Sequence, residues 1–202
     1  MKPLSIIVAV DMRGGFGKDG KIPWDIPEDL QRFKEITAGG ICIMGKNTYL
    51  DIRERRYKTT LEDFTKSESK ALTEIPDLLP GRQCYVISKS LFTKNNYSPG
   101  TNVRVPGNVF VKKSLRGVVE GIDRKDQRQI FILGGEKLFW EAWCWTTIIH
   151  MTIIKGEPFD CDRFFPVKHI AEEFKIVTGT KTDKVYNVQY RRFKNAEESK
   201  RG

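Results

Sequence analysis

Hydrophobic residues occur along this chain in short, nearly continuous runs that polar or glycine-containing segments separate. Runs of this kind are typical of strands that are buried on both faces of a parallel sheet. Towards the C-terminus the runs give way to alternating hydrophobic and polar positions, which are typical of an antiparallel hairpin. We therefore predict eight strands, over residues 4–10, 41–44, 83–87, 109–111, 129–133, 147–154, 173–179 and 185–193.

Helical spacing appears between these runs. After Ile26, apolar residues recur at Leu30, Phe33 and Ile36, and Pro27 suits the first position of a helix because its missing N–H has no partner there. We predict a helix over 27–37 from this pattern. Shorter helices are expected directly after residue 48, over 115–122 with a cap from Ser114, and after the second glycine of the pair at 134–135.

Strands and helices alternate through residue 145, and a hairpin with a turn around 182–184 follows. This order predicts an α/β fold with a mixed, mostly parallel central sheet of about eight strands, a C-terminal antiparallel hairpin and flanking helices. We expect residues 1–202 to form a single domain. Residues 53–78 carry six basic and six acidic side chains and no strand pattern, so we expect a surface insertion there, with some helix over 68–74.

Composition narrows the class of protein. The 202 residues are 39% hydrophobic and 30% charged, and no apolar run approaches the roughly 20 residues needed to span a bilayer. The apolar segment at the N-terminus is too short for a secretory signal, so we expect a cytoplasmic protein without a membrane partner. The net charge of +9 favours anionic partners but does not choose among phosphates, carboxylates and nucleic acid.

Cysteine and histidine usage argues against a metal site. The four cysteines are widely spaced without a C-x-x-C motif, and three of them lie within or beside apolar runs, so we expect buried free thiols. The chain has only two histidines and no H-E-x-x-H motif. We therefore expect no metal.

The predicted helix over 27–37 aims one acid inward. At about 100° per residue, Asp29 projects with Phe33 and Ile36, whereas Glu28 projects with Arg32 on the polar face. A carboxylate in apolar surroundings has a raised pKa and can exchange protons near neutral pH. The alternative is that Asp29 only stabilises the positive end of the helix dipole.

Three predicted strands end in small or hydroxyl residues followed by a lysine, at 44–48, 87–90 and 133–137. Ligands of open parallel sheets bind beyond the carboxyl ends of the strands, and helix N-termini bind phosphates. Three such corners suit an extended ligand such as a dinucleotide. Neither a G-x-G-x-x-G nor a P-loop motif is present, and any one corner alone could be ordinary connection geometry.

Several motifs together resemble the dihydrofolate reductase family, in family order and over nearly the whole chain. They are Ala9-Val10-Asp11, Ile22-Pro23-Trp24, Asp29-Leu30 with Phe33-Lys34, residues 43–48, Leu79-Pro80-Gly81-Arg82, Ile87-Ser88, Leu133-Gly134-Gly135, Thr152 and residues 162–166. The resemblance implies transfer of a hydride from NADPH to C6 of dihydrofolate while N5 gains a proton. It also implies that the catalytic residues are Asp29, Thr152 and Trp24. Asp29 would bind the pterin ring, Thr152 would share the hydrogen bonds of Asp29, and Trp24 would hold a water.

The resemblance also implies two sets of binding residues. Arg82 is matched to the arginine that binds the substrate carboxylate, Gly134 and Gly135 to a pair joined by a cis peptide, and Asp162 to a residue that holds the loop containing Ile22. Lys46, Lys89 and one of Lys112 or Lys113 are candidates for the adenosine 2′-phosphate. The substrate set is Ile7, Val8, Leu30, Phe33, Ile52, Leu79, Arg82 and Leu133. The cofactor set is Ala9, Gly17, Ile22, Gly45, Lys46, Asn47, Thr48, Ser88, Lys89, Leu133, Gly134, Gly135, Lys137, Leu138 and Phe139.

Two other functions remain open at this point. One is a reductase of the same fold that acts on a pyrimidine or another pterin-like ring, and the other is a non-catalytic scaffold or nucleic-acid-binding protein. No basic tract interleaved with aromatic residues supports nucleic-acid binding. We expect a monomer whose partner is the small-molecule substrate. The chain departs from the family in its longer 11–24 loop, in the 53–78 excursion and in Phe139, where the family often has tyrosine.

Overall fold

The computed structural model describes residues 2–57, 76–93, 103–105, 108–177, 181–183 and 188–196. Within these ranges the main sheet contains ten strands in the order β10-β12-β8-β1-β7-β3-β4-β6-β5, with β11 paired to β12. The strands are β1 Leu4–Asp11, β3 Ile41–Gly45, β4 Gln83–Ile87, β5 Val103–Val105, β6 Val109–Lys112, β7 Ile130–Gly134, β8 Thr146–Ile154, β10 Phe174–Ile176, β11 Lys181–Asp183 and β12 Val188–Asn195.

The centre of the sheet is parallel and both of its edges are antiparallel. β1 runs parallel to β7 and β8, and β3 runs parallel to β4 and β7. β12 is antiparallel to β8, β10 and β11, and β5 is antiparallel to β6. The predicted α/β class with a mostly parallel sheet and a terminal antiparallel hairpin is thus confirmed. Within this main sheet, the sequence did not predict β5 and β11, which have three residues each.

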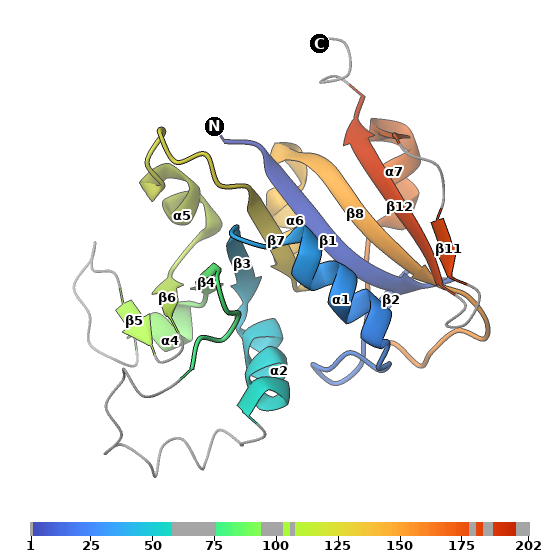
Figure 1. The fold of residues 1–202 in the computed structure, drawn as a ribbon, viewed down its shortest axis with the longest axis horizontal. Coiled ribbons are helices and arrows are strands. Elements are labelled where there is room, and N and C mark those ends of the chain that lie inside the picture. The colour runs from blue at the N-terminus through green and yellow to red at the C-terminus, as the bar shows by residue number, and fades with distance from the viewer. Residues whose placement is uncertain are drawn as a thin grey trace.

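Helices cover both faces of the sheet (Figure 1). Alternate residues of the central strands form two apolar clusters, one on each face. Helices α5 and α6 contribute to the larger cluster, and α1 and α2 lie on the face of the smaller one. The helices are α1 Pro27–Ile36, α2 Lys46–Tyr57, α4 Lys89–Thr93, α5 Leu115–Gly121, α6 Glu136–Ala142 and α7 Val167–Glu173, with the short helix η2 Trp143–Trp145 after α6.

Several local predictions are confirmed. Helix α1 begins at Pro27 as expected, and the side chain of Ser114 caps α5 by accepting a hydrogen bond from the Gly117 N–H. Cys42 and Cys84 are free thiols buried at paired positions of β3 and β4. Burial raises the pKa of the Cys84 thiol to about 12 and that of Cys42 further still.

Other predictions are wrong. Thr182 and Asp183, where a turn was expected, belong to β11, in which Asp183 pairs with Val188, because alternation alone does not reveal where a strand ends. The third residue of the expected turn, Lys184, lies outside the described residues. Cys144 is exposed rather than buried. The loop expected over 11–22 contains a strand, β2 Gly15–Gly17, that pairs with β9 Arg163–Phe164 in a second, two-stranded sheet.

The insertion expected over 53–78 begins too early. Helix α2 extends to Tyr57, and Arg53 is buried rather than on the surface. At the other end Leu78 is buried in the smaller apolar cluster. Residues 58–75, which include the helix expected over 68–74, lie outside the described residues.

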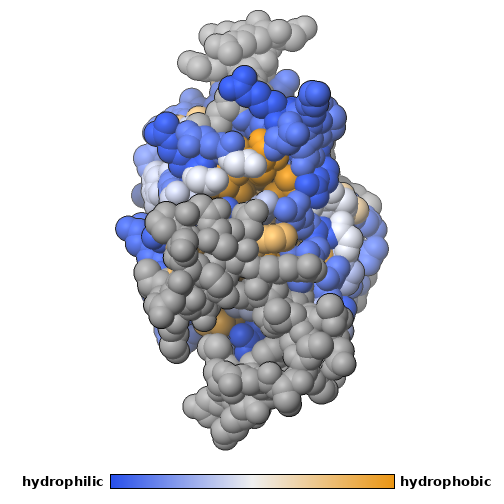
Figure 2. Space-filling model, turned by 90° about the vertical axis from the view of Figure 1, so that its left-hand side faces the viewer, coloured by the Kyte–Doolittle hydropathy of each residue, from blue (hydrophilic) through white to orange (hydrophobic). Residues whose placement is uncertain are grey.

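One face of the molecule carries a small apolar area among polar side chains. Figure 2 shows hydrophilic side chains around a limited apolar area on the face at the left of Figure 1. In the parts of the chain that the structure describes, no helix has the length and apolar character needed to cross a membrane.

Candidate functional site

The site is centred on a pair of polar side chains that join α1 to the sheet. The hydroxyl of Thr152 on β8 donates a hydrogen bond of 2.5 Å to Oδ1 of Asp29, in the first turn of α1. Thr152 is 1% exposed, and Asp29 is partly buried. One residue separates Thr152 from His150 along the strand, so both side chains lie on the same face of the sheet, below α1.

Burial raises the pKa of Asp29, as the sequence predicted. The hydrogen bond from Thr152 and the positive charge of Arg32 both act in the opposite direction, because they favour the ionised form. The surroundings of Asp29 therefore disfavour its ionised form, while the hydroxyl of Thr152 orients its carboxylate. A carboxylate of this kind can bind a nitrogen-rich ring edge through charge-assisted hydrogen bonds.

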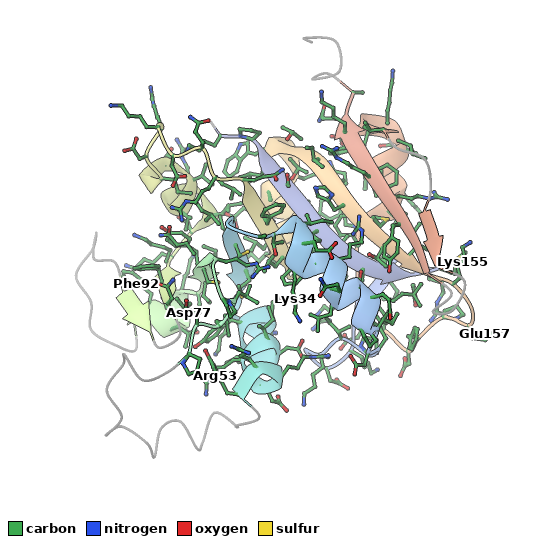
Figure 3. All side chains as sticks on the ribbon, viewed as in Figure 1. Lys34, Arg53, Asp77, Phe92, Lys155 and Glu157 are labelled. Atoms are coloured by element: carbon green, nitrogen blue, oxygen red, sulfur yellow. The ribbon has the colours of Figure 1, made fainter. Side chains whose placement is uncertain are left out.

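Apolar side chains of α1 flank this acid without being fully buried. Helix α1 has no fully buried side chain, Leu30 is 50% exposed, and Phe33 is partly covered. Across the sheet face, Ile7 is 8% exposed, and Leu133 packs with Ile52 of α2 against the smaller apolar cluster. Ile7, Ile52 and Leu133 thus lie on the sheet face that carries α1 and α2. Figure 3 shows these two helices, with Lys34 labelled on α1 and Arg53 on α2.

Arg82 lies at the far end of α1. Its Nε donates to Thr37 Oγ1 at 2.8 Å, its Nη1 donates to the carbonyl of Pro80 at 2.6 Å, and its Nη2 donates to the carbonyl of Lys34. Two of these bonds hold the guanidinium against the end of α1, and the third joins it to the turn that contains Pro80. Leu79, the last predicted member of the substrate set on this side, packs on the smaller cluster.

One member of the substrate set lies elsewhere. Val8 belongs to the larger apolar cluster, on the face of the sheet away from Asp29, because neighbouring residues of a strand point to opposite faces. Only its backbone faces the site. In the cofactor set, Ala9 pairs in register with Thr152.

The glycine corners meet at the carboxyl edge of the parallel strands. Met44 of β3 is in register with Gly134 of β7, and Gly45 is in register with Ile87 of β4. A Cβ atom at Gly45 would lie 3.4 Å from the N atom of Gly135, and one at Gly134 would lie 3.1 Å from the hydroxyl oxygen of Thr48. The peptide between the two glycines is cis, as the resemblance implied.

Donors suited to phosphates surround these corners. Lys46 and Asn47 are exposed in the first turn of α2, next to the half-buried Thr48. Ser88 is buried at the end of β4, where its hydroxyl oxygen accepts a hydrogen bond from the N–H of Leu91, and Lys89 is exposed beside it. Close backbone approach and a helix N-terminus are the features that a pyrophosphate requires, so these residues fit a dinucleotide.

The remaining members of the cofactor set divide into two groups. Lys137 is exposed on α6, but Leu138 and Phe139 point into the larger apolar cluster, and the Phe139 ring packs edge-on against Phe16 and Phe165. Phe139 is 1% exposed, so its side chain supports the Gly134 corner from below rather than facing outward. Lys112 ends β6, and Lys113 lies over the ring of Phe92 at 4.7 Å.

The loop before α1 contains the other predicted residues. Trp24 is half-buried with its ring 5.1 Å from that of Phe159, and Ile22 is 42% exposed. Asp162 contacts this loop as expected. Its backbone N–H donates to the carbonyl of Gly17 at 2.9 Å, and its carboxylate accepts from the N–H of Asp19 at 3.3 Å.

A polar layer lies below α1 that was not expected from the sequence. Arg32, which was expected on the polar face, is partly buried and lies 4.8 Å above the ring of Tyr190 on β12. His150 is 9% exposed, and burial together with the positive charges of Arg32 and Arg192 lowers its pKa to about 4. The spacing of Arg32 three residues after Asp29 was the available signal, but the strand that covers it comes from the far end of the sequence.

No cluster of three or more metal-ligating side chains occurs within the described parts of the chain.

Comparisons with known proteins agree with this geometry. The family model described as dihydrofolate reductase matches residues 3–62 and 58–195. The dihydrofolate reductase of Bacillus subtilis is 27% identical over 203 residues, which cover 98% of both chains, and the type 9 enzyme of Escherichia coli is 25% identical over 93% of both. A bifunctional dihydrofolate reductase-thymidylate synthase of Paramecium tetraurelia is 29% identical over 96% of this chain, which spans 35% of that longer protein.

A solved structure shares the fold. Dihydrofolate reductase from Enterococcus faecalis, in complex with NADP(H) and RAB-propyl, superposes with a TM-score of 0.67 over 96% of both chains, at 24% identity.

Proposed function

The chain belongs to the dihydrofolate reductase family, and from that membership and its site we propose that it reduces 7,8-dihydrofolate to 5,6,7,8-tetrahydrofolate with NADPH. The observation that carries this proposal is the bond from Thr152 to the partly buried Asp29, on the sheet face that α1 and α2 flank. NADPH, when bound, supplies the hydride for C6 of the substrate.

Asp29 binds and orients the pterin. Its carboxylate can accept hydrogen bonds from the amino group and the ring N–H of the substrate, and the hydroxyl of Thr152 fixes the direction of the carboxylate. Trp24 closes the wall beside it and holds the water through which the proton reaches N5. Leu30 and Phe33 contact the pterin and its benzoyl tail, and Arg82 pairs with the carboxylate at the end of that tail.

The glycine corners and their lysines bind the cofactor. Gly45, Gly134 and Gly135 let the backbone approach the dinucleotide closely, and the N-terminus of α2 faces its phosphates. Lys46 and Lys89 bind the adenosine 2′-phosphate, which gives a preference for NADPH over NADH. The complex of the Enterococcus faecalis relative with NADP(H) supports this assignment.

We further propose that the protein acts as a cytoplasmic monomer without a nucleic-acid partner, and that it forms a single domain. Sedimentation velocity tests the oligomeric state, because the fitted mass is 23.3 kDa for a monomer and twice that value for a dimer.

The test of the function follows NADPH absorbance in the presence of dihydrofolate. We expect oxidation by the natural chain and a loss of about 100-fold in kcat/KM for Asp29→Asn, which is the scale of a positioned proton-transfer group. Asp25→Asn is the matched control, because Asp25 is an exposed acid in the loop directly before α1. No oxidation by the natural chain would exclude the function, and equal rates for both Asn variants would exclude the role of Asp29.

The cofactor assignment has its own arm in the same assay. Lys46→Glu and Lys89→Glu should reduce the preference for NADPH over NADH, whereas Lys175→Glu, an exposed lysine of β10, should leave the preference unchanged. An unchanged preference in all three variants would overturn the phosphate assignment.

A further inference from the structure

The loop over residues 17–22 is fastened from two sides. Lys18 and Lys21 exchange backbone hydrogen bonds of 2.9 Å, so the loop forms a tight hairpin. On one side, Asp162 bonds to the loop backbone, and Asp160 forms an ion pair with Lys18 at 3.1 Å. The other side of the hairpin reaches α2.

Two contacts join the loop to α2. Arg55 Nη2 donates to the carbonyl of Ile22 at 2.9 Å, and Lys21 Nζ pairs with Glu54 Oε1 at 2.9 Å. The side chains of Lys21 and Glu54 are 59% and 50% exposed, so that ion pair contributes little on its own. The contact from Arg55 is different, because a buried acid holds its guanidinium.

That acid is Asp51, one turn earlier on α2. Its Oδ1 accepts from Arg55 Nε at 3.0 Å, and its side chain is only 7% exposed. Because a guanidinium is planar, a bond at Nε and a second at Nη2 fix the plane and direction of the whole group. Asp51, Arg55 and the Ile22 carbonyl therefore form a continuous connection from the interior of α2 to the loop.

From this connection we infer that Arg55, oriented by Asp51, is a positioning residue that holds Ile22 and the 17–22 loop against α2. The expected effect on the cofactor rests on the proposed function, in which the loop that contains Ile22 covers the nicotinamide of NADPH. Arg55 touches neither reacting atom. It controls how long the loop stays closed, and through the loop it controls retention of the cofactor.

The first arm of the test uses the ligand-free protein. Hydrogen exchange of the peptide spanning 17–24, followed by mass spectrometry, reports the opening of the loop directly. We expect exchange there to be about ten-fold faster in Arg55→Ala than in the natural chain, and intermediate in Arg55→Lys, whose ammonium lacks the fork that bonds Asp51 and Ile22 together. Arg56→Ala is the matched control, because Arg56 is an exposed arginine next in the same helix.

The second arm measures NADPH. We expect its dissociation rate and its KM to rise about ten-fold in Arg55→Ala, and less in Asp51→Asn. The pH profile of kcat should stay unchanged in both, because Asp29 is not altered. Circular dichroism establishes that each variant is folded, and Arg55→Lys replaces Arg55→Ala if the alanine variant is not.

The two arms separate the possible failures. Equal exchange at 17–24 in the Arg55 and Arg56 variants would overturn the inference, whatever the cofactor result. Faster exchange with unchanged NADPH release would confine Arg55 to the stability of the loop and overturn its role in retention. A natural chain that does not bind NADPH would refute the proposed function. The hydrogen-exchange measurement would still show whether Arg55 holds the 17–22 loop against α2.

Discussion

Helices α1 and α2 lie on the same face of the sheet but use their residues in opposite ways. In α1 no side chain is fully buried, and Leu30 is half exposed beside Asp29. In α2 three side chains are buried, and two of them, Asp51 and Arg53, are charged. The apolar face of α1 is therefore available to a ligand, whereas α2 packs firmly into the protein and carries polar groups inward. One helix presents binding surface, and the other supports it.

The largest test of this comparison is Tyr49→Ala on α2. Tyr49 is 6% exposed within the smaller apolar cluster, so its truncation leaves a cavity and should lower the free energy of unfolding by about 3–5 kcal/mol. Urea denaturation measures the change. A loss below about 1 kcal/mol would show that α2 does not anchor this face.

The second test concerns the layer below α1. Burial and the charges of Arg32 and Arg192 lower the pKa of His150 from 6.5 to about 4 in the native state. Between these values the unfolded chain binds the proton and the native state does not, so stability falls as the pH drops from 6.5 towards 4. At pH 5 the native protein should have lost about 2 kcal/mol through this residue.

His150→Phe should remove this acid sensitivity, because phenylalanine fills the site beside Phe131 without titrating. Comparing unfolding at pH 7 and pH 5 measures the effect. His169→Gln is the control, since the side chain of His169 is 48% exposed. The same pH dependence in the natural chain and His150→Phe would contradict the assignment.

The smallest effect is expected for Leu30→Ser on α1. Half of Leu30 is already exposed, so the substitution should change the free energy of unfolding by less than about 0.5 kcal/mol. It should raise the KM for dihydrofolate about five- to ten-fold, because the apolar contact with the substrate is lost, which corresponds to about 1 kcal/mol. A loss of stability without a change in KM would reverse the roles given to the two helices.

The difference between α1 and α2 also explains which parts of the fold could be predicted from the sequence. Helix α1 was predicted from its start at Pro27 to its end, and so was the inward direction of Asp29, because a regular apolar spacing and local chain geometry determine both. Helix α2 was expected only as a short element. Its buried residues include Asp51 and Arg53, and charged residues carry no apolar period.

Contacts between distant segments were the other limit. Arg32 was placed in solvent because the ring that covers it, Tyr190, lies more than 150 residues later. Arg55 and Ile22 are 33 residues apart, and nothing in either segment indicates the bond between them. The partner of Asp29, Thr152, was found only through the family resemblance, since a threonine in a strand has no distinctive spacing.

The buried position of Asp29, which the proposed function requires, lowers the stability of the native state. In the unfolded chain this carboxyl titrates near 3.8, and burial moves the native pKa upward, so the native state gives up its proton less readily. As the pH rises above 3.8 the native state therefore loses stability relative to the unfolded chain, and the loss is complete once the pH exceeds the raised native pKa. An uncharged amide at this position should melt at a higher temperature at pH 7, with the advantage vanishing below pH 3.8, while turnover collapses. Selection for thermal robustness alone would thus discard the residue to which we assign the binding of the pterin.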